Sequence, residues 1–142
     1  MDLAKYRNLF LEEATEHLAE MARALLELEK DSSRAEAIDV VFRMAHSIKG
    51  MAATLGYDAI SELAHKLEDH MDVYRAAGRV ESGEGLALVF RGLEGLERMV
   101  GVVRETGEPP AAAPAELLAA LGAAGAAQGP GSGAPKKARL RP

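Results

Sequence analysis

Three residues whose side chains could handle a phosphoryl group share one face of an expected helix. His46, Lys49 and Gly50 stand at positions i, i+3 and i+4, and side chains at these spacings lie on the same side of a helix. A histidine there can act as a nucleophile, a lysine can supply positive charge beside an incoming phosphate, and a glycine leaves the imidazole uncrowded. The spacing alone also fits a solvated histidine–lysine pair on a helix surface, which is the more common case.

A second polar cluster lies on the next expected helix. Its members Ser61, His65, Glu68 and Asp72 fall together on one flank of that helix, beside its apolar stripe. If the two helices are antiparallel neighbours, His65 and Glu68 approach His46. A hydrogen bond from either residue to one ring nitrogen of His46 would fix the tautomer and leave the lone pair of the other nitrogen free for attack. We interpret Asp72 as structural.

Four segments carry apolar residues at spacings of three and four, which predicts four amphipathic helices. The apolar positions are Leu3, Tyr6, Phe10, Ala14, Leu18, Met21, Leu25 and Leu28; Ile38, Val41, Phe42, Ala45, Ile48, Ala52 and Leu55; Ile60, Leu63, Ala64, Leu67, Met71 and Tyr74; and Leu86, Val89, Phe90, Leu93, Leu96, Val100 and Val103. Short connections favour an all-α, antiparallel up-down-up-down four-helix bundle. A continuous apolar interior leaves little room for a cofactor, so we expect function on an outer face.

Turn residues indicate where these helices begin and end. The stretch 31–33, Asp58 and Ser82 are expected to cap the second, third and fourth helices, because short oxygen-bearing side chains accept hydrogen bonds from the free N–H groups of a first turn. Gly56 and Gly78 are expected to end the second and third helices, because glycine adopts the left-handed conformation without strain.

The end of the chain differs from the rest in composition. All six prolines lie at or beyond Pro109, and the residues from 106 onward are largely Ala, Pro and Gly. We therefore predict a bundle domain over residues 1–105 and a flexible linker over residues 106–142. Residues 115–122 are compatible with a short fifth helix, and the basic end of the chain is interpreted as linker. A chain that stops within a linker is expected to be part of a longer protein.

The composition excludes several function classes. Because the sequence has no cysteine, disulfide frameworks, thiol catalysis and cysteine-based zinc sites are ruled out. Asp and Glu number 22 against 17 Lys and Arg, a net charge of -5, which argues against nucleic acid as a partner. No apolar run approaches the roughly 18 residues of a membrane span, and the first residues are typical of an amphipathic helix rather than a signal peptide. We expect a cytoplasmic protein without membrane insertion.

The stretch from His46 to Gly56, followed by the stretch from Glu62 to Glu68, resembles the histidine phosphotransfer (Hpt) domain at the amino terminus of the chemotaxis sensor kinase CheA. The resemblance spans about residues 1–105, with both segments in order. It implies the Hpt type of four-helix bundle for the fold.

The resemblance also implies roles for individual residues. His46 corresponds to the phosphorylated histidine and Glu68 to the carboxylate that hydrogen-bonds its ring. Lys49 and His65 complete the active surface, and Gly50 is the small residue beside the ring. Met51 departs from the family pattern, because many relatives carry a second small residue at that position.

In proteins of this family the domain is a phosphoacceptor and donor, and the full chain is a protein histidine kinase. The sequence has no Gly-rich phosphate loop, so no cofactor is expected on this domain. The resemblance implies that a separate ATP-binding kinase domain of a CheA-like dimer, carrying ATP and Mg²⁺, phosphorylates the histidine. It further implies transfer to an aspartate of a response regulator resembling CheY or CheB, with Mg²⁺ on the receiver.

Two other functions remain open at this point. A freestanding Hpt protein of a multistep phosphorelay would need the same histidine, but it would not need the long Ala/Pro/Gly-rich linker. A metal-binding bundle could use His46, His65, Glu68 or His70, but Lys49 would repel a cation, and the paired Glu-x-x-His signature of di-iron bundles is missing. Apart from that alternative, we interpret His17 and His70 as ordinary surface histidines.

Overall fold

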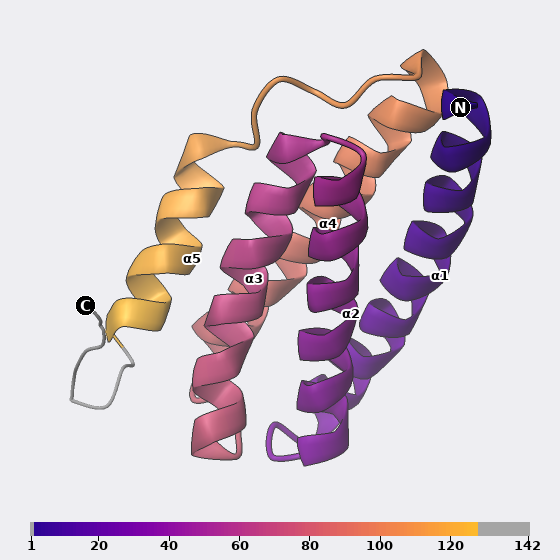
Figure 1. The fold of residues 1–142 in the computed structure, drawn as a ribbon. Coiled ribbons are helices and arrows are strands. Elements are labelled where there is room, and N and C mark those ends of the chain that lie inside the picture. Colours follow the sequence, from indigo (N-terminus) through magenta and orange to yellow (C-terminus); the bar gives the residue numbers. More distant parts are fainter. Residues whose placement is uncertain (1, 128–142) are drawn as a thin grey trace.

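The computed structural model describes residues 2–127 of the chain, which form five α-helices (Figure 1). The helices are α1 (Leu3–Lys30), α2 (Ala35–Thr54), α3 (Asp58–Ala77), α4 (Gly83–Thr106) and α5 (Ala115–Ala127). Helix α1 packs against α2 and α4, and α3 packs against the same two helices. The first four helices thus run alternately up and down around one core, which confirms the predicted all-α antiparallel bundle.

The fifth helix packs on the outside of this bundle. After α4 the chain crosses the end of the bundle, and α5 then lies against α3 and α4 (Figure 1). Leu117 and Leu121 of α5, with Ala113 before it, are buried in the core. The helix predicted at residues 115–122 is therefore present as α5, whereas the division at residue 105 stays a prediction. The basic end of the predicted linker lies outside the described residues.

Aliphatic side chains fill the interior at helical spacing. The largest fully buried side chains are Tyr74, Met21, Leu25, Leu28, Ile38, Ile48, Ile60, Leu63, Leu67, Met71, Leu96 and Leu121. Two predicted inward residues are instead exposed, Leu3 by 70% and Tyr6 by 44%. Both residues belong to the first two turns of α1, at the end of the bundle. The apolar stripe of α1 begins there, before the first residue that the neighbouring helices bury, Phe10.

Two of the predicted caps at the helix starts are wrong. Ser82 does cap α4, accepting a hydrogen bond from the Gly85 N–H at 3.0 Å. Asp58 is instead the first residue of α3, and the capping position before it makes no side-chain bond. Helix α2 begins at Ala35, also without a side-chain cap, because Asp31 directs its carboxylate to the N–H and hydroxyl of Ser33.

The helix ends agree with the prediction from glycine. Gly56 and Gly78 adopt φ angles of 76° and 81°, in the left-handed region that glycine favours. Gly78 directly follows α3, and Gly56 follows Leu55, the residue that caps α2. The tight turn at Gly56 brings α3 back alongside α2, which places the two polar clusters on neighbouring helices. Among the residues described, no helix is long and apolar enough to cross a membrane.

Candidate functional site

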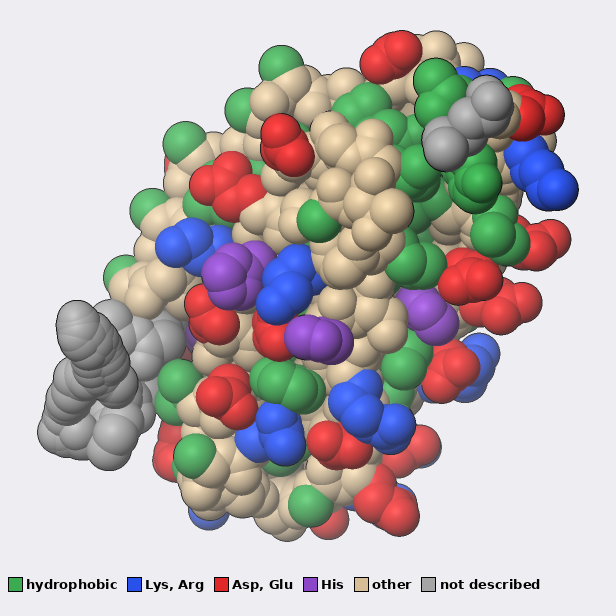
Figure 2. Space-filling view, viewed as in Figure 1, with side chains coloured by type: hydrophobic (Ala, Val, Ile, Leu, Met, Phe, Trp, Pro, Cys, Tyr) green, Lys and Arg blue, Asp and Glu red, His purple; other side chains and the backbone are tan. Residues whose placement is uncertain are grey.

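The predicted nucleophile stands on the outer face of α2. Ala45, Ile48 and Ala52 are fully buried on the opposite side of this helix, and that packing turns His46 toward water. Its side chain is 62% exposed. Figure 2 shows histidine and lysine or arginine side chains gathered with carboxylates in the middle of this face, over α2 and α3.

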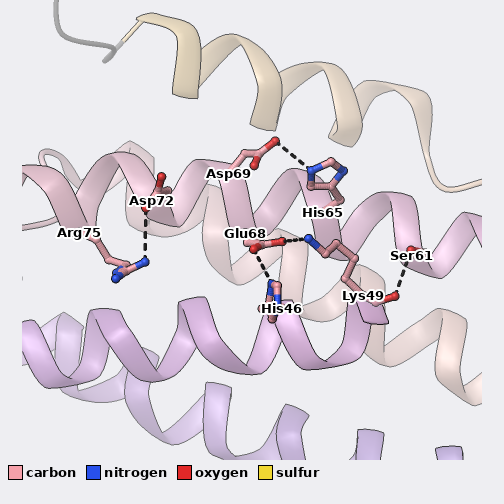
Figure 3. Close-up of polar contacts among 8 residues, drawn as sticks. All are labelled: His46, Lys49, Ser61, His65, Glu68, Asp69, Asp72 and Arg75. Atoms are coloured by element: carbon pink, nitrogen blue, oxygen red, sulfur yellow. Dashed lines mark hydrogen bonds and ion pairs between the residues drawn. The ribbon is translucent and has the colours of Figure 1, made fainter. Parts of the chain in front are cut away.

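Glu68 of α3 joins the two predicted functional residues of α2 (Figure 3). Its Oε2 atom lies 2.7 Å from Nδ1 of His46, and its Oε1 atom lies 2.6 Å from Nζ of Lys49. The Glu68 side chain is only 11% exposed. Its contacts with these two partners therefore offset the free-energy cost of removing the carboxylate from water. One carboxylate therefore orients the histidine and forms an ion pair with the lysine.

The electrostatics keep this carboxylate ionised. Burial raises the pKa of Glu68, but the hydrogen bonds and charges of Lys49 and His46 together hold that pKa below its usual value of 4.5. An ionised Glu68 accepts a hydrogen bond from Nδ1–H of His46, which assigns the proton to that nitrogen. The lone pair of His46 then resides on Nε2, and a lone pair on an exposed ring can attack an electrophile.

Both the side chain and the backbone of Lys49 contact α3. Its ammonium group is held by Glu68, and its backbone carbonyl accepts a hydrogen bond from the hydroxyl of Ser61 at 3.1 Å. Ser61 lies two turns before Glu68 on α3. Two polar contacts thus join α2 and α3 beside His46.

The remaining predicted residues lie around this centre. His65 pairs with Asp69 on its own helix, Nε2 to Oδ2 at 3.6 Å, rather than with His46 (Figure 3). A Cβ atom added at Gly50 would meet no neighbouring atom within 4 Å, so this side of the site is open. Asp72 pairs with Arg75, Oδ1 to Nη1 at 3.4 Å. The supporting role of His65 therefore stays a prediction.

An aromatic neighbour of His46, and the arginine that covers it, were not foreseen from the sequence. Phe42 lies one turn earlier on α2, with its ring plane 11° from that of His46 and the ring centroids 6.5 Å apart. The Arg75 guanidinium carbon lies 4.0 Å from the centroid of the Phe42 ring. The spacing of four between Phe42 and His46 was the available signal. Phe42 is partly buried and packs against the core, as the apolar stripe predicts.

The interpretation of His70 as a surface residue is wrong. This residue is 1% exposed, and its ring meets the Tyr74 ring edge to face with centroids 4.8 Å apart. Burial lowers the pKa of His70, and backbone carbonyls of Leu121 and Gly85 offset part of that effect. His70 is thus a neutral core residue beneath α5. Over the described part of the chain, no group of three His, Cys, Asp or Glu could hold a metal ion.

Comparison with known proteins places the chain in a family. A sequence model described as the Hpt domain matches residues 5–124. The chemotaxis protein CheA of Bacillus subtilis is 36% identical over 108 residues, covering 76% of this chain and 16% of the relative. CheA of Halobacterium salinarum is 35% identical over 103 residues, covering 72% of this chain and 15% of the relative. The chain therefore spans about a sixth of the length of these relatives.

Solved structures agree with this assignment. The CheA phosphotransferase domain from Thermotoga maritima is 33% identical with a TM-score of 0.67, covering 73% of this chain and 98% of that one. The phosphorylated P1 domain of CheA3 from R. sphaeroides, solved in complex with CheY6, has a TM-score of 0.80 at 23% identity. It covers 88% of this chain and 98% of its own, and it supports the fold. The chain belongs to the histidine phosphotransfer (Hpt) domain family, and its relatives are CheA chemotaxis proteins.

Proposed function

We propose that this chain is the phosphotransfer module of a two-component chemotaxis kinase and that His46 carries the phosphoryl group. The observation that carries the proposal is the Glu68 carboxylate, which binds Nδ1 of His46 and Nζ of Lys49 on an exposed face. This geometry fixes the tautomer and leaves Nε2 free. The family relationship supports it, and the P1 domain of CheA3 has itself been solved with a response regulator, CheY6.

The first transfer forms one bond and breaks one. The Nε2 lone pair attacks the γ-phosphorus of ATP held by a kinase domain, the Nε2–P bond forms, and the bond to the bridging oxygen of ADP breaks. The ring then carries a proton on Nδ1 and phosphorus on Nε2 and is cationic. Glu68 stabilises this positive charge through the hydrogen bond at Nδ1. Lys49 supplies positive charge beside the phosphoryl oxygens.

The second transfer reverses the first at the same nitrogen. A receiver aspartate attacks the phosphorus in line, an acyl phosphate forms, and Nε2 leaves as the neutral nitrogen of the imidazole. An exposed ring beside the open space at Gly50 allows a second protein to approach. His65, paired with Asp69 on the neighbouring turn, adds polar character to the surface that the partner covers.

We place ATP and Mg²⁺ on the kinase domain of a CheA-like dimer and a second Mg²⁺ on the CheY- or CheB-like receiver. The carboxylate of the site here, Glu68, is already engaged by Lys49 and His46, and an ammonium at 2.6 Å disfavours a cation beside it. We also place these steps in the cytoplasm. The domain therefore serves as the mobile substrate of both steps.

Radiolabelling with the kinase domain of a CheA relative tests the proposal. Incubation with γ-labelled ATP and Mg²⁺ is expected to place an acid-labile, base-stable phosphate on the wild-type chain, and added receiver is expected to remove it. His46→Gln is expected to abolish labelling, while the control His17→Gln on α1 keeps it. Labelling that survives in His46→Gln would overturn the assignment.

A further inference from the structure

The hydrogen bond to Glu68 holds the His46 ring at one point only. Beyond its covalent bond to Cβ, the ring is held by this one contact at Nδ1, so coupled changes in χ1 and χ2 can still tilt its plane, although the transfer requires Nε2 to point at the incoming phosphorus. On the side of Gly50 there is open space, and the side chain is 62% exposed. A second contact is therefore needed to fix the plane of the ring.

Phe42 provides that second contact. Helical side chains lean toward the amino terminus, so His46 leans toward the residue one turn earlier on α2. The two rings are nearly parallel, 11° apart, with centroids separated by 6.5 Å. This separation lies within the range of offset aromatic pairs. Phe42 thus forms a wall on the side of the imidazole opposite Gly50.

Phe42 is itself held from α3. The guanidinium of Arg75 covers its ring, with the central carbon 4.0 Å from the ring centroid. Arg75 is in turn held by a carboxylate of each helix, Nε lying 3.7 Å from Asp39 Oδ1 and Nη1 lying 3.4 Å from Asp72 Oδ1. Figure 3 shows Arg75 reaching from α3 toward α2, on the other side of Glu68 from Ser61.

We propose that Phe42, held in place by Arg75, is a positioning residue for phosphotransfer that fixes the plane of the His46 ring. This inference rests on the proposed function of His46. Glu68 sets the tautomer and one point of the ring, and Phe42 sets the direction in which Nε2 points. Phe42 has no group that can bond to phosphate, and the guanidinium of Arg75 is engaged by Asp39 and Asp72, so their removal alters how often the ring is aligned and leaves His46, Lys49 and Glu68 intact.

Substitutions at Phe42 test this role. Phe42→Leu keeps an apolar side chain but removes the ring, and it is expected to lower kcat for phosphorylation by the kinase domain about 2- to 10-fold with KM unchanged. Phe42→Tyr retains the ring and is expected to restore the wild-type rate. The matched control is Phe90→Leu on α4, a partly buried aromatic residue on a helix that does not pack against α2 within the described bundle.

Arg75→Lys provides a second variant on the more exposed residue, in case Phe42→Leu folds poorly. Lysine keeps the charge but loses the planar stacking, so we expect a loss of about 2- to 5-fold in kcat. Ring ¹³C relaxation of His46 in the unphosphorylated chain gives a readout independent of the kinase. We expect a lower order parameter in Phe42→Leu and Arg75→Lys, and wild-type values in Phe42→Tyr.

Two outcomes separate this inference from the proposed function. If the wild-type chain is not labelled on His46, the proposed function fails. If it is labelled, but Phe42→Leu and Arg75→Lys show wild-type kcat and wild-type ring order, Phe42 and Arg75 are structural residues and this inference is overturned while the proposed function stands.

Discussion

Two histidines of this bundle occupy opposite environments. His46 of α2 is 62% exposed and bonded to a carboxylate at 2.7 Å, whereas His70 of α3 is 1% exposed and packs against an aromatic ring. Only the first has both access to a partner and an acceptor that assigns its proton. A histidine thus becomes a candidate nucleophile when its ring is exposed and hydrogen-bonded to a carboxylate. When apolar side chains surround the ring, the same residue is part of the core.

The glycines beside these histidines repeat the contrast. A Cβ at Gly50, one turn after His46, would meet no neighbouring atom within 4 Å. A Cβ at Gly85 would overlap the hydroxyl of Tyr74, the residue that packs on His70. At the outer site, around His46, Gly50 leaves space for another molecule. At the inner site, around His70, Gly85 leaves space for the side chain of Tyr74.

The largest expected effect comes from Glu68→Gln. Glutamine keeps the shape but removes the charge that binds His46 and Lys49, so we expect phosphorylation by the kinase domain to slow about 10- to 100-fold, since hydrogen bonds to charged groups contribute about 1.5–3 kcal/mol. Single-turnover labelling measures the rate. Glu62→Gln, an exposed carboxylate on the same helix, is the control, and an equal rate in both variants would remove Glu68 from the mechanism.

At the inner site, Gly85→Ala is expected to lower the free energy of unfolding by about 1–3 kcal/mol, because the new methyl group overpacks against Tyr74. Urea denaturation measures the change. In a Tyr74→Phe background the clash with the hydroxyl disappears, so the same substitution is expected to cost less, and the two values form a double-mutant cycle. Equal costs in both backgrounds would show that the Tyr74 hydroxyl is not the obstacle.

The buried histidine predicts a pH dependence of stability. Because burial lowers the pKa of His70 in the folded chain, the unfolded chain binds more protons once the pH falls below the ordinary value of 6.5. The free energy of unfolding is therefore expected to decrease as the pH falls through this value, by at most about 1.4 kcal/mol per pH unit from this group. His70→Phe is expected to flatten the dependence between pH 7.5 and 5.5, and an unchanged slope would contradict this origin.

The smallest effects concern glycines inside helices. Gly50→Ala and Gly101→Ala place a methyl group where nothing lies within 4 Å, so each is expected to stabilise the fold by up to about 1 kcal/mol through helix propensity. Only Gly50→Ala is expected also to slow transfer to the receiver, by a few fold, because its methyl group would occupy the open space through which the receiver approaches His46. If Gly101→Ala slowed transfer equally, steric access at Gly50 would not be the reason.

Periodicity and spacing predicted the helical fold and the core of the site for physical reasons. The i, i+3 relation of His46 to Lys49 places both on one face, and the short turn at Gly56 makes α2 and α3 neighbours, which brings Glu68 into reach. His70 could not be placed because α5, some 45 residues later in the sequence, helps to cover it. Phe42 packs against the core as its place in the apolar stripe predicts, but it lies at the border of that stripe, and its position beside the His46 ring was not foreseen.

Nuclear magnetic resonance of the phosphorylated chain with ¹⁵N-labelled histidines tests the central claim most directly. The phosphorus atom is expected to couple to Nε2 of His46, while Nδ1 of the same ring retains its proton and its hydrogen bond to Glu68. Phosphorus bound to Nδ1 of His46, or to any other residue, would contradict the account.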